Sequence, residues 1–368
     1  MKILHIINSL TTGGAEKLID DLLPLLKNNH GIDVSVLLLT DERMFFKENL
    51  EENDIPIDIV KCNKNYSFKN IYHIRKYIKT YEFDLVHAHL FPTTYWLALA
   101  TKLRIRKKPK LMMTEHSTHN RRRDKKILKP LEKYIYSHYD KVISISEGTQ
   151  ENLIKWLQPR NKDKFIVIPN GIDFDTFNQA TPLNRIILND ELTAKDILLC
   201  MVGSLSPQKD QSTIIRSLKH LDENVKLILV GDGPRKEEIK NLISDLGLIH
   251  RVFLLGNRRD VPNILKTIDI PIVSSKWEGF GLVAVEGMAA GKPLIASNIS
   301  GLNSIVEGAG LLFEQGNEQD LAQKIKQLIT NYEYYEATKA HCLKRSNLYN
   351  ISNMAEKYNK SYLKVLSK

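Results

Sequence analysis

The chain has 368 residues, of which 42% are hydrophobic and 26% charged, and its net charge is +10. This is a globular composition, and no apolar run approaches the roughly 18–20 residues that span a bilayer. The length favours two domains, because single hydrophobic cores stop growing near roughly 250–300 residues. The three cysteines lie far apart and do not suggest a disulfide framework, so a cytoplasmic protein is expected.

Short apolar runs alternate with helix-length amphipathic segments along the whole chain. Those of the first half span residues 3–7, 34–39, 85–89, 111–114, 142–145 and 165–168, and those of the second half span 197–202, 226–230, 252–255, 270–274, 294–297 and 311–313. Continuous Val/Ile/Leu runs separated by helices are typical of parallel strands covered on both faces. Two such series predict an α/β protein with two Rossmann-like, doubly wound parallel-sheet domains.

The domain boundary is predicted after residues 168–173, because Pro169 and the pair Asn170-Gly171 are strong turn signals. A polar connector then precedes the strand at 197–202. The expected division is 1–178 for the first domain, 179–345 for the second, and 346–368 for a last helix that packs back on the first.

Three strand ends in the first half carry residues suited to ligand contact. Gly13 and Gly14 open a helix, where glycine lets backbone approach a phosphate; a plain strand-to-helix turn is the alternative. His87 and His89 share one face of a strand, so either one is structural and the other faces an acceptor, or both are structural. A metal pair is also conceivable but lacks a third ligand nearby. His116 follows another strand and is a candidate sugar contact or a surface histidine.

Two loops of the second half carry weaker signals. Gly203 permits close backbone approach, and Lys209 can direct a positive charge at a diphosphate, although a solvated lysine fits equally well. The backbone near Asn257 and Arg258 can border a nucleobase, or form only a turn.

The most informative segment runs from Ser274 to Pro293, where a strand leads through a Gly-Phe-Gly turn into a helix. Amides at a helix start bind phosphates and hydroxyls, and here they belong to Phe280, Gly281 and Leu282. Glu278 precedes the helix and can accept from sugar hydroxyls. Glu286 lies about one turn inside it and can accept from ribose hydroxyls, as acidic residues do in other nucleotide sites. The segment therefore predicts a nucleotide-sugar site.

Positive charge is concentrated between Lys102 and Lys141, which hold fourteen Lys or Arg against four Asp or Glu. Within this stretch, Arg121–Tyr136 mixes basic and apolar residues at helix-like spacing. A basic amphipathic helix suits an anionic membrane, so a peripheral position on the inner face of the cell membrane is one hypothesis. A solvated helix with its apolar face packed in the first domain is the other.

The order of these motifs resembles the retaining glycosyltransferases of family 4, which have the GT-B fold. The likeness runs from Gly13 to about Phe313 and includes Gly-Gly-Ala-Glu (13–16), His-Ala-His (87–89), Thr-Glu-His (114–116), Ile-Ser-Glu (145–147), Ile-Pro-Asn-Gly-Ile-Asp (168–173), Gly-Asp-Gly-Pro (231–234), Leu-Gly-Asn-Arg-Arg-Asp-Val (255–261) and the pair Glu278/Glu286. Each motif alone is weakly specific, but their succession is specific.

The resemblance implies two domains that face a cleft, the first binding the acceptor and the second the donor. It implies a retaining, metal-independent hexosyl- or N-acetylhexosaminyltransferase without a cofactor. Its donor would be a nucleotide-diphosphate sugar, with UDP-sugars favoured, and its acceptor a glycan or lipid-linked glycan of surface polysaccharide synthesis. The implied roles are diphosphate binding for Lys209, sugar binding for Glu278 and the amides of residues 280–282, ribose binding for Glu286, donor-phosphate contact for Gly14 and donor-sugar contact for His116.

One departure concerns the diphosphate. Family members usually carry Gly-Arg where this chain has Gly203-Ser204. A serine supplies one hydrogen bond but neither charge nor fork, so either Arg258 or Arg259 substitutes, or the donor is held more weakly.

Two other classes of protein stay open. A sugar-nucleotide epimerase on the same fold would share donor binding but need no acceptor. A non-enzymatic, basic nucleic-acid-binding protein would use the stretch 102–141, but no nucleic-acid module supports it, so no nucleic-acid partner is expected.

Overall fold

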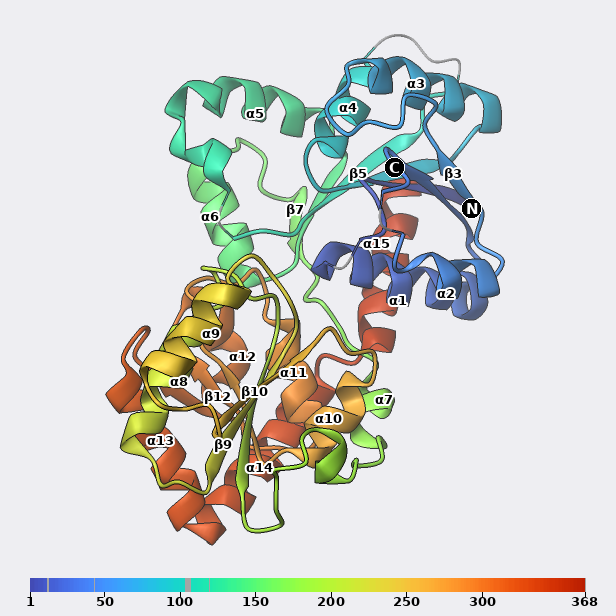
Figure 1. Cartoon of the computed structure of the whole chain (residues 1–368). Coiled ribbons are helices and arrows are strands. Elements are labelled where there is room, and N and C mark those ends of the chain that lie inside the picture. Colours follow the sequence, from blue (N-terminus) through green and yellow to red (C-terminus); the bar gives the residue numbers. More distant parts are fainter. Residues whose placement is uncertain (12, 43, 103–106, 119, 368) are drawn as a thin grey trace. The chain divides into compact units, whose positions relative to one another are not determined.

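The computed structural model describes residues 1–11, 13–42, 44–102, 107–118 and 120–367, without the side chain of Arg121. The chain forms two compact units (Figure 1). The first unit comprises Met1–Gly171 with Ile351–Lys368, and the second comprises Ile172–Asn350. Among the described residues, no helix is both long and apolar enough to cross a membrane.

The first unit is built on a parallel sheet that, in the part of the chain described, has seven strands in the order β3-β2-β1-β4-β5-β6-β7. The strands are β1 (Lys2–Ile7), β2 (Asp33–Leu38), β3 (Ile57–Ile59), β4 (Leu85–His89), β5 (Lys110–Glu115), β6 (Lys141–Ser144) and β7 (Phe165–Val167). The helices are α1 (Gly14–His30), α2 (Lys47–Glu52), α3 (Lys69–Tyr81), α4 (Thr93–Ala100), α5 (Lys129–Ser137), α6 (Glu147–Leu157) and α15 (Ile351–Leu366).

The second unit repeats this plan, with six strands among its described residues in the order β10-β9-β8-β11-β12-β13, all parallel. The strands are β8 (Ile197–Val202), β9 (Val225–Val230), β10 (Val252–Gly256), β11 (Ile270–Val273), β12 (Ile295–Ser297) and β13 (Leu311–Phe313). The helices are α7 (Phe174–Asn178), α8 (Gln211–Ser217), α9 (Lys236–Asp245), α10 (Val261–Thr267), α11 (Leu282–Ala289), α12 (Ser300–Val306), α13 (Glu318–Thr330) and α14 (Tyr332–Asn347).

The prediction of two doubly wound parallel sheets is confirmed. In each unit the strand order reverses at one place, between β1 and β4 in the first and between β8 and β11 in the second. Ligands of open α/β sheets bind outside the carboxyl ends of the strands at such a reversal. The topology therefore indicates that a ligand would bind at the loops that follow these four strands.

The unit boundaries differ by a few residues from the division expected at 178/179 and 345/346. Helix α7 belongs to the second unit, where Lys266 Nζ donates to the carbonyl of Asn178 at 2.6 Å. A β-bridge pairs Ile172 with Asn350, the first and last residues of the second unit. This pairing holds both ends of the segment 172–350 in that unit. Helix α15 lies in the first unit, where it packs beside α1 (Figure 1).

The stretch 121–136 is not one amphipathic helix. Two 3-10 turns, Arg121–Asp124 and Lys126–Leu128, come first, and α5 begins only at Lys129 with Pro130 in its first turn. Proline is favoured in the first turn of a helix, where its missing N–H would have no partner, and this matches the place of Pro130 in α5. The expectation of continuous helical spacing from Arg121 is therefore wrong.

Candidate active site

The loops after β8 and β11 are tied together at the strand reversal of the second unit. Ser274 Oγ donates to the carbonyls of Lys209 and Asp210 at 3.1 and 3.0 Å. The amide of Lys276 donates to the carbonyl of Gln208 at 2.7 Å. Strand β11 thus ends directly against the loop that carries Lys209, and the two loops form one surface.

Lys209 and Glu278 meet on this surface. Lys209 Nζ lies 2.5 Å from Glu278 Oε1, and Ser275 Oγ donates to the same oxygen at 2.6 Å. Glu278 is only 8% exposed, so its carboxylate is held by a charge and a hydroxyl rather than by bulk water. The φ of Gly203 is +152°, and a Cβ there would lie 3.3 Å from Lys209 Cε, so glycine leaves room for the lysine stem.

Helix α11 starts beside this ion pair. Gly281 precedes it with φ of +86°, and a Cβ there would come within 2.3 Å of Leu302 Cδ2. Phe280 is buried and packs edge-on against Tyr349, with ring centroids 5.4 Å apart. The Phe280 side chain therefore belongs to the core, and its backbone amide, with those of Gly281 and Leu282, is what the helix start offers a ligand. Glu286 is half-buried in the second turn of α11.

The carboxyl ends of β1 and β4 mark the corresponding place in the first unit. Gly14 is exposed at the start of α1, while Thr12 of the same motif lies outside the described residues. Glu16 in the first turn is buried, and burial raises the pKa of its carboxyl group. The α1 start thus presents exposed backbone at Gly14, as a phosphate contact requires.

His87 and His89 both lie in the interior, each 0% exposed. His87 Nδ1 lies 2.9 Å from Tyr362 Oη, and its Nε2 lies 2.8 Å from Thr114 Oγ1. His89 contacts His5 through Nε2 at 3.0 Å and His116 through Nδ1 at 3.1 Å. With both nitrogens of each ring engaged, the structure favours the alternative in which both histidines are structural.

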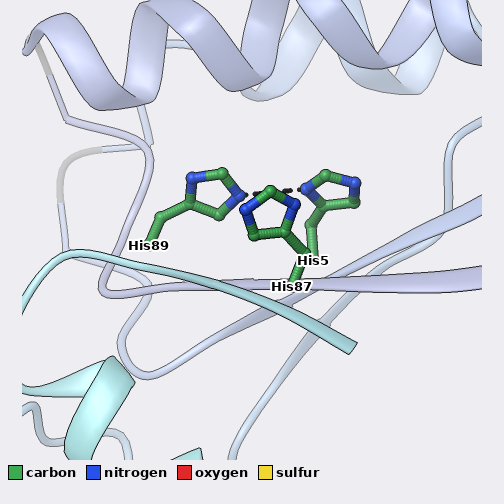
Figure 2. A group of neighbouring side chains, drawn as sticks. All are labelled: His5, His87 and His89. Atoms are coloured by element: carbon green, nitrogen blue, oxygen red, sulfur yellow. Dashed lines mark hydrogen bonds between the residues drawn. The ribbon is translucent and has the colours of Figure 1, made fainter. Parts of the chain in front are cut away.

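The expectation that no third metal-type ligand lies near this pair is wrong. His5 of β1 is aligned with His87 of β4 in the sheet register. Among the described residues, the ring nitrogens of His5, His87 and His89 gather within 4.8 Å of one another (Figure 2). Neutral imidazoles are common zinc ligands, so the residue types of this cluster are those of a metal site.

His116 lies at the edge of a cavity of about 220 Å³ beyond the carboxyl ends of β4 and β5. The cavity is lined by Leu90, Phe91, Thr94, Met113, Thr114, Glu115, His116, Ser117, Asn120, Arg122 and Tyr136. His116 Nδ1 is buried and has no hydrogen-bond partner among the described residues. Within the described part of the chain, this ring thus has one unpaired nitrogen, while the other contacts His89.

Two arginines of the basic stretch turn toward this region instead of toward solvent. Arg123 is paired with Glu115 at 2.7 Å, and Arg122 is paired with Glu132 at 3.2 Å. The Arg122 guanidinium also lies over the Phe91 ring, 3.9 Å from its centroid. Together these contacts build a charged wall of the cavity.

Two family models match the chain. Residues 12–176 match the model described as Glycosyltransferase Family 4, and residues 186–344 match Glycosyl transferases group 1. A galactosyltransferase of Escherichia coli, named as UDP-Gal:alpha-D-GlcNAc-diphosphoundecaprenol alpha-1,3-galactosyltransferase, is 31% identical over 74% of this chain and 71% of its own.

This chain belongs to glycosyltransferase family 4.

Three further comparisons extend over nearly the whole glycosyltransferase. An N-acetylgalactosaminyltransferase of Campylobacter jejuni, whose name specifies a diphospho-undecaprenol-linked acceptor, is 25% identical over 90% of this chain and 91% of its own. Anabaena HepE, solved with UDP and glucose, superposes with a TM-score of 0.84 at 24% identity and covers 98% of this chain and 99% of its own. A glycosyltransferase of Rickettsia africae gives a TM-score of 0.86 at 23% identity, covering 99% and 98%. The fold is therefore GT-B, as predicted.

This glycosyltransferase has Ser204 in the loop after β8, where family members usually carry an arginine. Ser204 is exposed, and its Oγ donates to Ser206 Oγ at 3.2 Å. Arg258, one of the two expected substitutes, is held by both carboxylate oxygens of Asp260 at 2.7 and 2.6 Å, and Asn257 is exposed beside it. A diphosphate would have to displace Asp260 to form a bidentate contact with the guanidinium of Arg258.

Two residues around Glu278 were not predicted from the sequence. Ser275 Oγ donates to Glu278, and a Cβ on Gly301 would lie 2.2 Å from the Glu278 carbonyl, so α12 packs closely against this loop. Gly301, at a strand-to-helix turn, gives a sequence signal, whereas the role of Ser275 depends on loop packing.

Proposed function

We propose that this glycosyltransferase transfers a sugar from a UDP-sugar to a lipid-linked glycan with retention of anomeric configuration, in surface polysaccharide synthesis. The observation that carries the donor half is the Lys209–Glu278 pair beside the start of α11. The acceptor half is supported by the diphosphoundecaprenol acceptors in the names of the Escherichia coli and Campylobacter relatives. The UDP assignment is supported by the former name.

The charge distribution explains how the site would promote the reaction. Departure of a nucleoside diphosphate leaves negative charge on phosphate oxygens and an oxocarbenium-like sugar. Lys209 and the amides of residues 280–282 are fixed before the reaction, so they stabilise the growing charge with little reorganisation. Glu278 would accept hydrogen bonds from sugar hydroxyls, and Glu286 would accept from the ribose.

Retention follows from the same-face chemistry that we propose. The acceptor hydroxyl would enter on the face that the diphosphate leaves, and a leaving phosphate oxygen would take its proton. No protein nucleophile is nominated. We also propose that turnover needs no metal ion or cofactor, since Lys209 and the helix start supply positive charge; undiminished turnover in EDTA is the expected result.

Gly14 and His116 are proposed for the donor phosphate and the donor sugar, on the strength of the family resemblance. Their structural setting supports these roles within the first unit. Gly14 is exposed at a helix start, and His116 offers a buried Nδ1 at the edge of a cavity. Glycine keeps the backbone accessible, and a neutral imidazole can exchange one hydrogen bond with a hydroxyl.

A thermal-shift screen against UDP-, GDP- and ADP-sugars tests the donor assignment. We expect stabilisation by UDP-sugars and a smaller response to the other two. No stabilisation by any of them would refute the donor site. Incubation with the donor alone separates transfer from epimerisation, because an epimerase would convert the donor sugar without an acceptor. The family matches favour neither the epimerase nor the nucleic-acid hypothesis.

A second proposal concerns the outer surface of residues 121–136. Ile127 is 86% exposed, Leu131 46% and Tyr134 39%. Lys125, Lys126 and Lys133 are exposed among them. Apolar side chains flanked by lysines suit the interface of an anionic membrane, even though the segment is not one helix. We propose that this surface docks the enzyme on the cytoplasmic leaflet, where a lipid-linked acceptor would lie.

A further inference from the structure

A continuous hydrogen-bonded chain crosses the interior of the first unit and ends at the cavity. Its links, in order, are Tyr358 Oη to Thr114 Oγ1 (3.2 Å), Thr114 Oγ1 to His87 Nε2 (2.8 Å), His87 Nδ1 to Tyr362 Oη (2.9 Å), Tyr362 Oη to His5 Nε2 (3.5 Å), His5 Nδ1 to His89 Nε2 (3.0 Å) and His89 Nδ1 to His116 Nε2 (3.1 Å). Helix α15 thereby reaches His116 through groups that are all buried up to His89.

The three clustered imidazoles are better arranged for this chain than for a metal ion. The rings of His87 and His89 stack, with centroids 4.4 Å apart and planes 22° apart, so their in-plane lone pairs run side by side instead of converging (Figure 2). The link from His5 to His89 is a direct contact between two ring nitrogens. A metal would have to break such contacts to reach the lone pairs.

The rings in the chain are neutral. Burial lowers the pKa of His5 and His116 to about 3 and holds those of His87 and His89 well below the ordinary value. A neutral imidazole has one donor nitrogen and one acceptor nitrogen. Each ring that donates through one nitrogen must therefore accept through the other.

This constraint leaves two proton arrangements for His5, His89 and His116, because these three rings contact one another nitrogen to nitrogen. If His116 donates from Nε2 to His89, then His89 donates from Nε2 to His5, and His5 donates from Nε2 to Tyr362. In the opposite arrangement all three rings carry the proton on Nδ1. His87 is linked to them only through the Tyr362 hydroxyl, which can accept from two donors, so its tautomer is not tied to theirs. The first arrangement leaves His116 Nδ1 as an acceptor, and the second makes it a donor.

We infer that His5 and His89 are positioning residues that hold His116 in one shared tautomer, so that its other nitrogen has one defined hydrogen-bonding role toward a sugar hydroxyl. The catalytic consequence rests on the proposed function, but the shared tautomer does not. Neither residue touches the cavity; they act through His116.

Nitrogen-15 NMR of the full-length protein labelled at histidine tests the inference without donor or turnover. We expect His5, His89 and His116 to be neutral and to carry their protons on the same nitrogen, all Nε2 or all Nδ1. A mixed set among these three rings, or rapid averaging between tautomers, would overturn the proposal. Addition of Zn²⁺ should leave these signals unchanged, and stoichiometric zinc binding with their loss would also overturn it.

Two matched substitutions on α15 locate the end of the coupled set. Tyr362→Phe removes the hydroxyl that contacts His5 Nε2 and His87 Nδ1, so it should change the His5 signal while His5, His89 and His116 still match. Tyr358→Phe removes an equally buried hydroxyl that contacts Thr114 and should leave the His5 signal unchanged. Equal effects of the two variants on the His5 signal would contradict the contact through Tyr362.

Turnover measurements distinguish a positioning role of His5 from a role in packing alone. His5→Leu cuts the chain and should lower kcat about 10-fold or more while the donor KM changes little, since one misplaced catalytic hydrogen bond costs at least that much. His5→Gln can still donate and accept, so it should recover most of kcat. Equal activity of the two variants at matched thermal stability would refute the positioning role. Absence of any transferase activity in the wild type would refute the proposed function instead, and the NMR result would be unaffected.

Discussion

Lys209 shows how one side chain acquires a role through its neighbours. In sequence it is an ordinary lysine in a polar loop. In the structure its stem passes the bare Cα of Gly203, and its Nζ is fixed on Glu278. A charge held in this way loses little conformational freedom when a diphosphate arrives, which is what distinguishes it from a solvated lysine.

Lys209→Met should therefore lower kcat/KM for a UDP-sugar by about 100- to 1000-fold, the usual loss for one preorganised electrostatic contact. Steady-state kinetics measures it, and circular dichroism checks the fold. Lys276→Met is the control, because that exposed lysine lies 3.8 Å from Asp210 on the neighbouring loop. An equal loss in both variants would mean that general surface charge, not the placed lysine, binds the donor.

His5 shows what could not be read at the residue scale. It lies inside the apolar run 3–7, and nothing in the sequence connects it with His87 and His89, more than 80 residues away. Only the register of β1 against β4 aligns His5 with His87. The inward pairing of Arg122 and Arg123 could not be predicted for a related reason, because it depends on Glu132 and Glu115 from other elements.

At the scale of elements, the donor loop depends on how closely α12 approaches it. A Cβ on Gly301 would meet the Glu278 carbonyl at 2.2 Å, and the obstacle is backbone, which cannot rotate away. Gly301→Ala should cost about 1–3 kcal/mol of unfolding free energy, as overpacking does, and weaken donor binding. Urea unfolding and calorimetry with a UDP-sugar measure the two effects. Ser300→Ala, an exposed neighbour, should show neither.

The segment 121–136 carries the membrane proposal at the same scale. Ile127→Ser should lower partitioning onto vesicles containing anionic lipid by about 10-fold, equivalent to about 1.4 kcal/mol of lost apolar insertion. Co-sedimentation measures it, with zwitterionic vesicles beside the anionic ones. Ile187→Ser removes an isoleucine that is 58% exposed in the second unit and should change nothing. Equal binding of wild type to both vesicle types would refute the docking surface.

At the scale of the whole molecule, the sequence predicted the architecture because the strands are buried on both faces. Buried parallel strands appear in the sequence as unbroken apolar runs, such as residues 3–7 and 197–202. The alternation of these runs with helices specifies the fold class. The boundaries were less predictable. Ile172 and Asn350 are joined by a bridge between segments 178 residues apart, and local turn signals carry no information about such pairing.

The buried histidine chain also sets how the first unit responds to acid. His5, His87, His89 and His116 have folded-state pKa values lowered by burial, whereas the unfolded chain binds protons near 6.5. Stability is therefore complete above about pH 6.5 and is lost as the pH falls from there toward 3. Between pH 7 and pH 5 His5 and His116 should each cost about 2 kcal/mol of unfolding free energy, and His87 and His89 should lower it further.

Urea unfolding followed by tryptophan fluorescence at several pH values measures this loss, since Trp96 and Trp156 both lie in the first unit. His5→Gln removes one titrating ring, so its stability should fall less steeply with acid than that of the wild type, whatever its absolute value. His250→Gln replaces a histidine of the second unit whose side chain is 80% exposed, and should leave the slope unchanged. Identical slopes in all three proteins would show that the four rings do not resist protonation together, and would remove the basis for treating them as a neutral chain.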